Sequence, residues 1–242
     1  MKTELRNVLV VPEGDGVEVK RLFPIRDFMN ADPFVLWDHF NIGSGQGFPD
    51  HPHRGFEGIT YMFKGGMNHK DNLGNESFVS AGGAQRFTAG SGLVHSEMPA
   101  DQGDSNGIQL WVNLPKKLKQ IAPSYQQVNA DEFPVNKFEG GQVKTIVGDG
   151  SLVKLNTEVI YQHINLQDKA HYQLDVKPQF RGLVYVMQGS VSVNEKIVNN
   201  DKALFIEDVQ SLEFTANSAT EFMICLGQPS GEKIHQHGPF VD

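Results

Sequence analysis

The feature that most constrains the fold is a period-two alternation of apolar and polar residues, which glycines interrupt at short intervals. Ile59, Tyr61 and Phe63 share one face of such a segment, which ends at Gly65 and Gly66. Residues two apart lie on the same face of an extended chain, so the pattern predicts a β-strand closed by a turn. The 25 glycines and 12 prolines suit a chain of many short strands. Helical patterns are scarce, which argues against parallel α/β folds.

The chain also contains two similar halves. Residues 61–66 (YMFKGG) align with residues 185–190 (YVMQGS), and further short β-rich segments follow each of them. A duplicated jelly-roll barrel explains this similarity. Three prolines interrupt the alternation between residues 115 and 139, where we place the connection. The sequence therefore predicts an all-β fold with two domains, residues 1–120 and 121–242.

Composition argues against several classes of function. The formal net charge is −8, whereas proteins that bind nucleic acids need a basic surface to displace counterions, so we expect no direct nucleic-acid binding. Cys225 is the only cysteine, which rules out an intrachain disulfide and fits a reducing compartment. No stretch approaches the roughly 18 apolar residues of a membrane span. We therefore expect a cytoplasmic protein without a membrane partner, and we expect Cys225 to lie in the core.

Four side chains with metal-binding groups occur as two pairs. His51 and His53 form the first pair, His95 and Glu97 form the second, and one residue separates the members of each pair. In an extended strand, residues i and i+2 point to the same side and lie about 6.6 Å apart. Two such pairs on neighbouring antiparallel strands would bring three imidazoles and one carboxylate to one ion, with metal–nitrogen bonds of about 2.0–2.1 Å. The sequence therefore predicts one mononuclear metal site in the N-terminal half.

A purely structural role for the histidine pair, and two rival metal chemistries, fit the sequence less well. A lone His-x-His motif is weak evidence, but four polar residues on exposed strands would leave the glycines and prolines around both pairs unexplained. Dinuclear zinc hydrolases usually continue the motif as HxHxDH, whereas residues 54–56 are Arg-Gly-Phe. The amidohydrolase motif opens a (β/α) barrel, for which helices are missing. The ligands alone do not select among iron, nickel, cobalt, manganese, copper and zinc.

Four motifs carry a resemblance to a known family: residues 50–57 (DHPHRGFE), 88–98 (TAGSGLVHSEM), 109–114 (QLWVNL) and 236–240 (QHGPF). With these motifs the chain resembles the pirin family of the cupin superfamily over essentially its whole length. The resemblance implies a bicupin, with two tandem cupin (jelly-roll β-barrel) domains. It also implies one metal ion, generally Fe(II), in the N-terminal barrel only.

The resemblance implies ligands and an activity as well. It carries the ligand roles over to His51, His53, His95 and Glu97. It implies quercetin 2,3-dioxygenase activity, in which a flavonol is opened with O2 and carbon monoxide is released. For the animal members it implies a transcriptional co-regulator role. The alternative hypothesis is therefore a metal-dependent, redox-sensing regulatory protein that acts through a protein partner.

Several neighbouring residues receive interpretations of their own. Glu97 could act as a ligand, as a general base for the flavonol proton, or as both in succession, and we favour the ligand role first. Glu57 lies four residues after His53 and is a candidate for a supporting role beside the ligands or for direct ligation. We read Trp111 as a core residue and His69 as structural or on the surface. The neighbours that could line an apolar pocket for a planar aromatic are Phe48, Phe56 and Met98.

The C-terminal half lacks the residues for a second site. At the offset that aligns the two halves, Asp175 and Lys177 stand where the first half has His51 and His53. The C-terminal copy therefore cannot build the same centre, and we expect it to contribute packing.

Overall fold

The structure, a computed structural model, describes residues 2–99 and 104–242. The chain forms two compact units, each assembled from three stretches of sequence. The unit that we call the first barrel comprises Leu9–Glu132, Leu155–Thr157 and Ser230–Asp242. The unit that we call the second barrel comprises Met1–Val8, Phe133–Lys154 and Glu158–Pro229.

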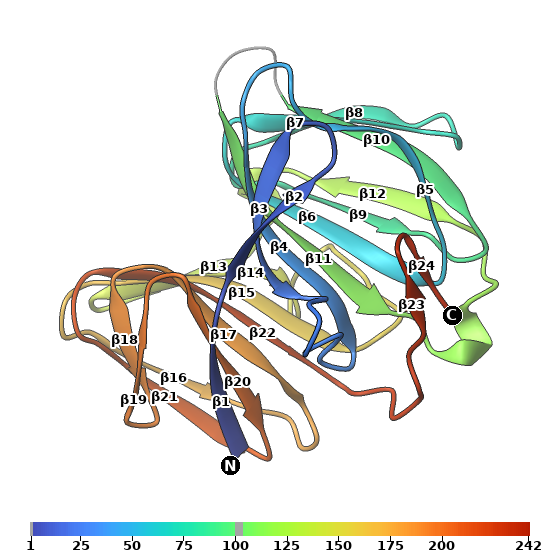
Figure 1. Cartoon of the computed structure of the whole chain (residues 1–242). Helices are drawn as coiled ribbons and strands as arrows, with labels where there is room; N and C mark the ends of the chain where they lie inside the picture. The colour runs from blue at the N-terminus through green and yellow to red at the C-terminus, as the bar shows by residue number, and fades with distance from the viewer. Residues whose placement is uncertain (1, 100–103) are drawn as a thin grey trace. The chain divides into compact units, whose positions relative to one another are not determined.

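The first barrel consists of two antiparallel sheets that face each other (Figure 1). The strand order of the seven-stranded sheet is β12 (Ser124–Val128), β9 (Ala84–Thr88), β6 (Phe56–Lys64), β11 (Ser105–Asn113), β4 (Phe34–Ile42), β3 (Val17–Phe23) and β2 (Leu9–Glu13). The order of the four-stranded sheet is β5 (Phe48–His53), β10 (Leu93–Pro99), β7 (Gly66–Asp71) and β8 (Glu76–Ser80). A short hairpin of β23 (Gln236–His237) and β24 (Phe240–Val241) completes this unit.

The second barrel repeats this architecture. The order of its seven-stranded sheet is β1 (Lys2–Asn7), β20 (Lys202–Glu207), β17 (Arg181–Gln188), β22 (Thr220–Gly227), β15 (Val159–Leu166), β14 (Gly141–Val147) and β13 (Val135–Phe138). The order of its four-stranded sheet is β16 (His171–Asp175), β21 (Ser211–Ala216), β18 (Ser190–Val193) and β19 (Lys196–Asn199). The prediction of an all-β chain with a duplicated architecture is confirmed.

Helices contribute little to the described part of the chain. The helical elements there are two 3-10 turns, Lys116–Leu118 and Ala130–Glu132. No helix among the described residues has both the length and the apolar character that a membrane span requires.

The alternating pattern at residues 59–63 forms the middle of β6, as predicted. The strand ends at Gly65, whose φ of +70° lies in the left-handed region that favours glycine. A Cβ at this position would lie 2.5 Å from the backbone oxygen of Asp104, so the turn also needs the missing side chain. The glycine therefore fixes where β6 turns into β7.

The two barrels differ in what fills them. A cluster of buried apolar side chains, among them Phe180, Val184 and Phe222, fills the second barrel. The first barrel has apolar clusters too, but buried polar residues lie among them, including His53, His95 and Glu97. Burying polar groups costs free energy unless they are paired or bind something. The first barrel is therefore the place to look for a functional site.

Candidate metal centre

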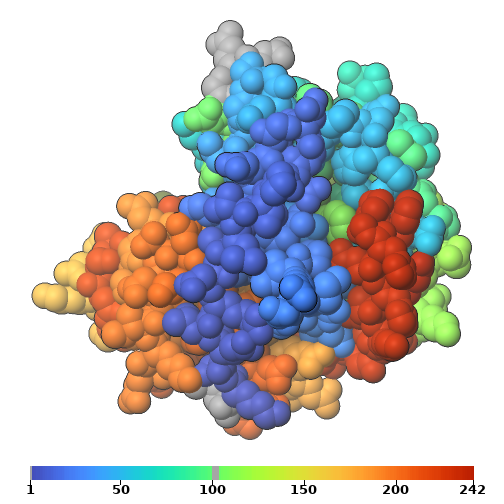
Figure 2. All heavy atoms as spheres, viewed as in Figure 1, coloured from blue at the N-terminus to red at the C-terminus, as the bar shows by residue number. Residues whose placement is uncertain are grey.

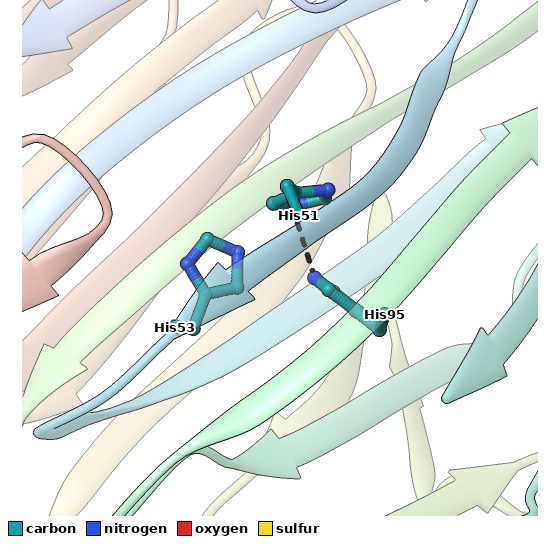
Figure 3. Close-up of side chains that lie close together, drawn as sticks. All are labelled: His51, His53 and His95. Atoms are coloured by element: carbon teal, nitrogen blue, oxygen red, sulfur yellow. Dashed lines mark hydrogen bonds between the residues drawn. The ribbon is translucent and has the colours of Figure 1, made fainter. Parts of the chain in front are cut away.

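Three histidines meet inside the first barrel. His51 and His53 lie on β5, and His95 lies on the neighbouring β10, where it is the direct cross-strand partner of His51. One donor atom from each of the three residues lies within 4.8 Å of the other two. Figure 3 shows the three rings converging on one point between the two strands. The i and i+2 spacing places the imidazoles of His51 and His53 on one side of β5, and strand pairing brings the imidazole of His95 beside them.

Backbone carbonyls set which nitrogen of two rings faces this point. Nδ1 of His51 lies 2.8 Å from the carbonyl oxygen of Pro49, and Nδ1 of His53 lies 3.3 Å from that of Pro239. A carbonyl oxygen only accepts, so each Nδ1 carries the proton and each Nε2 keeps its lone pair. Neutral histidines whose other ring nitrogen donates to a carbonyl are the usual form of metal ligands.

The spacing of the nitrogens fits a shared ion. Nε2 of His51 and Nε2 of His95 are 3.1 Å apart, close enough for one ion to reach both with bonds of about 2.0–2.1 Å. Nε2 of His53 is buried and has no hydrogen-bond partner among the described residues. Such an orphaned acceptor is costly unless something binds it. The residues present therefore fit a metal ion.

The surroundings also keep two of the histidines uncharged. Burial, together with the neighbouring His95 and His51, lowers the pKa of His53 to about 2. Burial, with His51 and His69 nearby, lowers the pKa of His95 well below its usual range. A neutral imidazole is the form that binds a cation, so no proton would compete with a metal ion for these two rings near pH 7.

Glu97 stands beside the histidine cluster. Its Oε2 lies 4.0 Å from Nε2 of His95. Its Oε1 accepts hydrogen bonds from the hydroxyl of Thr60, at 2.7 Å, and from the side-chain amide of Gln85. Among the described residues, the potential ligand atoms that lie within 4.8 Å of one another come from the three histidines. Glu97 is not in this group. The structure thus brings the three histidines together, and Oε2 is the oxygen of Glu97 that lies beside them.

A cavity of about 470 Å³ opens onto this cluster. His51, His53 and Glu97 line it, and so do the apolar side chains of Phe48 and Trp111. Charged and polar side chains line it as well, among them Arg21, Asp38 and Gln109. The cavity therefore offers space for a small organic molecule that has both apolar and polar groups, in contact with His51 and His53.

The three residues expected to line a pocket take different places. Phe48 lines the cavity. Phe56 lies behind it, with its ring 5.1 Å from that of His53 and stacked 4.0 Å from that of Trp111. Met98 lies on the outer face of β10 and is 37 % exposed, because side chains alternate along a strand and Glu97 points inward. Met98 is not among the residues that line the cavity.

Glu57 is buried at a different place in the barrel. Its carboxylate accepts a hydrogen bond of 2.8 Å from the hydroxyl of Thr88. It also accepts bonds from the backbone N–H and the side-chain amide of Asn156, at 2.7 and 2.9 Å. Glu57 therefore holds residues 155–157 in place within the first barrel. Both oxygens of its carboxylate accept hydrogen bonds there.

A segment far along the chain forms part of the site. We call residues 230–242 the C-terminal strap. Gln236, Gly238 and Pro239 line the cavity, and the carbonyl of Pro239 orients His53, which is 186 residues away in sequence. Figure 2 shows the strap in red, lying on the surface of the first barrel.

Side-chain contacts from Arg54 and Lys119, together with a close backbone approach at Gly55, hold the strap. The guanidinium of Arg54 forms two hydrogen bonds, of 2.9 and 2.8 Å, with the carboxylate of Asp242. Nζ of Lys119 donates to the carbonyls of Gly55 and Val241, at 2.9 and 2.8 Å. Gly55 has a φ of +82°, and a Cβ there would lie 1.8 Å from the carbonyl oxygen of Val241. The close approach of the strap therefore depends on glycine at position 55.

Sequence reasoning missed the place of His69. This residue is buried, its ring lies 5.3 Å from that of His95, and its Nε2 lies 3.1 Å from Oδ2 of Asp71. The ring also stacks on Tyr125, with centroids 4.1 Å apart. Asp71 is two residues after His69 and pairs with His95 across the strands. The sequence did contain a signal for this contact, because His69 and Asp71 form a further pair of polar residues two apart.

Trp111 is buried, in agreement with its reading as core, and it also forms part of the cavity wall. The second barrel offers no comparable cluster: among the described residues, the only group of three or more potential ligands is the one in the first barrel. Cys225 lies buried in the second barrel, as predicted.

Comparisons with known proteins agree with this architecture. The model of the family called Pirin matches residues 16–112, and the model called Pirin C-terminal cupin domain matches residues 161–242. A pirin-like protein from Caulobacter vibrioides is 37 % identical, and the match covers 95 % of this chain and 87 % of the relative. Pirin from Homo sapiens is 35 % identical over 95 % of this chain and 83 % of its own length.

Solved structures show the same fold. Quercetin 2,3-dioxygenase from Acinetobacter baumannii superposes with a TM-score of 0.90 at 28 % identity, covering 100 % of this chain and 90 % of that one. The bacterial pirin YhhW from Escherichia coli, solved in complex with nickel(II), superposes with a TM-score of 0.79 at 26 % identity, covering 94 % and 99 %. The matched family models, the level of identity and the extent of coverage lead to one conclusion: the chain belongs to the pirin family and consists of two cupin domains.

Proposed function

We propose that this protein is a metal-dependent dioxygenase that opens a flavonol-like aromatic such as quercetin. In this reaction one flavonol and one O2 yield one carbon monoxide and a depside. His51, His53, His95 and Glu97 would hold a single divalent ion, which we take to be Fe(II). The observation that carries the proposal is the cavity of about 470 Å³ whose wall includes both apolar rings and the side chains of His51 and His53.

The comparisons support this proposal at the level of the family. One similar structure is named a quercetin 2,3-dioxygenase, and another is a pirin in complex with nickel(II). Three imidazoles and a carboxylate suit several divalent metals, so the donor set is compatible with iron and with nickel.

The residues of the chain have distinct tasks in this reaction. The bound ion would act as a Lewis acid and lower the pKa of a hydroxyl that reaches it. The carbonyls of Pro49 and Pro239 hold the rings of His51 and His53 with Nε2 turned inward. Phe48 and Trp111 provide apolar walls that exclude water and accommodate a planar aromatic. The site would therefore combine an electrophilic centre with a cavity that has both apolar and polar walls.

The first test is reconstitution of the metal-free protein with Fe(II) under anaerobic conditions. On addition of air and quercetin, we expect oxygen uptake and release of carbon monoxide in equal amounts. Turnover no faster than that of the same concentration of free Fe(II) would contradict the dioxygenase proposal. A protein that retained the metal but lacked turnover would favour the alternative of a metal-dependent regulatory protein.

A further inference from the structure

A row of polar side chains crosses the inner face of the seven-stranded sheet of the first barrel. Its members are direct cross-strand partners on successive strands: Arg21 on β3, Asp38 on β4, Gln109 on β11, Thr60 on β6 and Gln85 on β9. Cross-strand partners point to the same face of a sheet, so the five side chains form one line. Polar residues are costly in a barrel interior unless they are hydrogen-bonded, so the bonds of this row indicate its purpose.

The end of the row on β11, β6 and β9 receives Glu97 from the opposite sheet. Oε1 of Glu97 accepts from the hydroxyl of Thr60 at 2.7 Å and from the amide of Gln85. The hydroxyl oxygen of Thr60 is also 2.5 Å from Oε1 of Gln109, but a charged carboxylate is the stronger acceptor for its single proton. Oε1 of Glu97 therefore accepts two hydrogen bonds, whereas Oε2 accepts one longer bond, of 3.4 Å, from the side-chain amide of Gln109 and lies 4.0 Å from Nε2 of His95.

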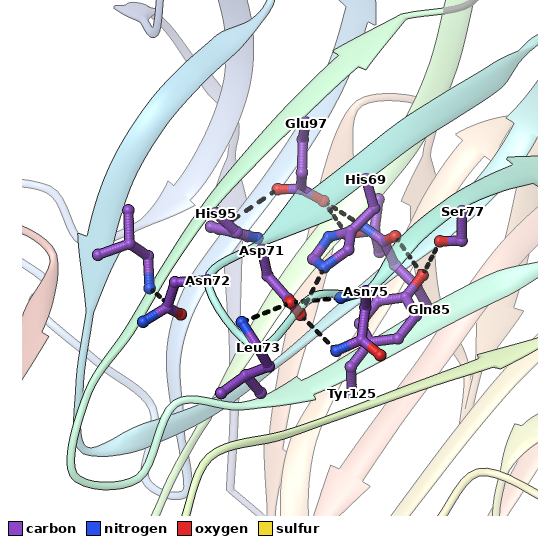
Figure 4. A network of polar contacts seen from close by, with 12 residues as sticks. His69, Asp71, Asn72, Leu73, Asn75, Ser77, Gln85, His95, Glu97 and Tyr125 are labelled. Atoms are coloured by element: carbon purple, nitrogen blue, oxygen red, sulfur yellow. Dashed lines mark hydrogen bonds and ion pairs between the residues drawn. The ribbon is translucent and has the colours of Figure 1, made fainter.

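Gln85 is itself held in one orientation. Its Oε1 accepts from the hydroxyl of Tyr125 at 3.1 Å, which leaves its NH2 group directed at Glu97. The hydroxyl of Tyr125 lies 2.5 Å from that of Ser77, and its ring stacks on His69. Figure 4 shows this network running from Glu97 through Gln85 to Tyr125. The amide cannot turn over without losing bonds at both ends.

We propose that Thr60 and Gln85 are positioning residues that hold Glu97 as a one-oxygen metal ligand through Oε2 and keep Oε1 away from the ion. This inference rests on the metal centre proposed above. It decides among the roles left open for Glu97: because Oε1 is engaged by two donors and Oε2 lies on the side of His95, Glu97 serves as a ligand and not as the base that accepts the substrate proton. A carboxylate that binds through one oxygen also leaves a coordination position for the substrate.

The same barrel contains a matched control. Thr88 is buried like Thr60, lies in the same seven-stranded sheet, and donates a hydrogen bond of 2.8 Å to the buried carboxylate of Glu57. The two threonine–glutamate pairs differ in position, because only Glu97 lies beside the histidines. Replacing either threonine with valine removes one hydroxyl from one buried carboxylate at nearly constant volume. A purely structural role would give both variants the same phenotype.

The experiment uses Co(II), whose visible absorption spectrum reports its coordination. The full chain is loaded with Co(II), and its affinity is measured by competition with a chelator. In Thr60→Val and Gln85→Leu we expect an altered Co(II) spectrum and an affinity lower by about tenfold, the lower end of the usual effect of residues that orient a ligand. Thr60→Ser keeps the hydroxyl and should restore both readouts. Thr88→Val should unfold at a lower temperature with the wild-type spectrum.

Failure of the inference and failure of the metal centre are distinguishable. A wild-type chain that does not bind Co(II) would contradict the centre itself. If the wild-type chain binds Co(II), and Thr60→Val and Gln85→Leu keep its spectrum and affinity as Thr88→Val does, the positioning role is overturned while the centre stands. If Thr60→Val does not fold, Gln85→Leu decides the question alone, because it removes the other donor to the same oxygen.

Discussion

At the scale of single residues, His53 owes its uncharged form to what surrounds it. Burial beside His95 and His51 lowers the pKa of His53 to about 2, compared with an ordinary value of 6.5. The folded chain therefore does not protonate this ring until the pH is far below 6.5, whereas the unfolded chain protonates it as the pH falls through 6.5. By linkage, the contribution of neutral His53 to stability is complete above pH 6.5 and is lost progressively as the pH falls towards 2.

This linkage gives a prediction for the metal-free protein. Its unfolding temperature should fall when the pH is lowered from 7 to 5, and the fall should be smaller in His53→Gln, because glutamine does not titrate. Thermal unfolding of both proteins at the two pH values measures the difference. Equal falls in the wild type and the variant would show that His53 is as easily protonated in the folded chain as in the unfolded chain.

The sequence predicted single residues well where the pattern is local. His51 and His53, and likewise His95 and Glu97, lie two apart, and strand geometry alone places each pair on one face. The partners of these residues were not predictable in this way. The carbonyl of Pro239 that orients His53 is 186 residues away, and Thr60 and Gln85 meet Glu97 only because two sheets face each other.

At the scale of elements, the C-terminal strap is held by a close approach that a single methyl group would prevent. In Gly55→Ala the new Cβ would lie only 1.8 Å from the carbonyl oxygen of Val241, so the two atoms would clash. The backbone at this position also has a φ of +82°. The left-handed backbone alone costs about 1–2 kcal/mol for a residue with a Cβ. We expect a larger loss in the free energy of unfolding, because the strap must also move.

Gly74→Ala is the matched control for this prediction. Gly74 has a φ of +90°, and a Cβ there would have no heavy atom within 4 Å. The free energy of unfolding of Gly74→Ala should therefore fall only by the cost of the left-handed backbone. Denaturant unfolding of the two variants measures the difference, and an equal loss in both would mean that the strap tolerates the extra atom.

The elements of the two barrels were predictable to different degrees. The strand around residues 59–63 and its glycine turn follow from the alternation, and they are confirmed as β6 and the turn into β7. The strap was not predictable as a part of the first barrel. Its segments β23 and β24 have two residues each, too few for any periodic pattern.

At the scale of the whole molecule, two copies of one architecture have different interiors. The second barrel is filled by apolar side chains, whereas the first contains the polar row and the histidine cluster. At the sequence offset, Asp175 and Lys177 stand in place of the first histidine pair, but in the structure the strand β16 ends at Asp175, so Lys177 lies outside it. The polar row was not predicted, because its members come from five strands and are scattered among apolar residues.

Metal binding should therefore be visible as a change in the stability of the chain. A ligand that binds only the folded state at 100 times its Kd adds about 2.7 kcal/mol to the free energy of unfolding. Ni(II) or Fe(II) should raise the unfolding temperature of the wild type. His51→Ala and His95→Ala should fold, as judged by circular dichroism, but should bind no metal and show no such rise. Retention of metal by either variant would contradict the ligand assignment.

The hydrogen bond between His53 and Pro239 also bears on how the protein is made. Chains emerge from the ribosome with the N-terminus first, so His53 is synthesised 186 residues before the carbonyl that orients it. The strands of the first barrel are available early, but the ring of His53 acquires its fixed tautomer only after residues 230–242 have been added and have docked. Orientation of the His53 ring is thus a late event in biogenesis, coupled to the completion of a segment that is translated after the whole second barrel.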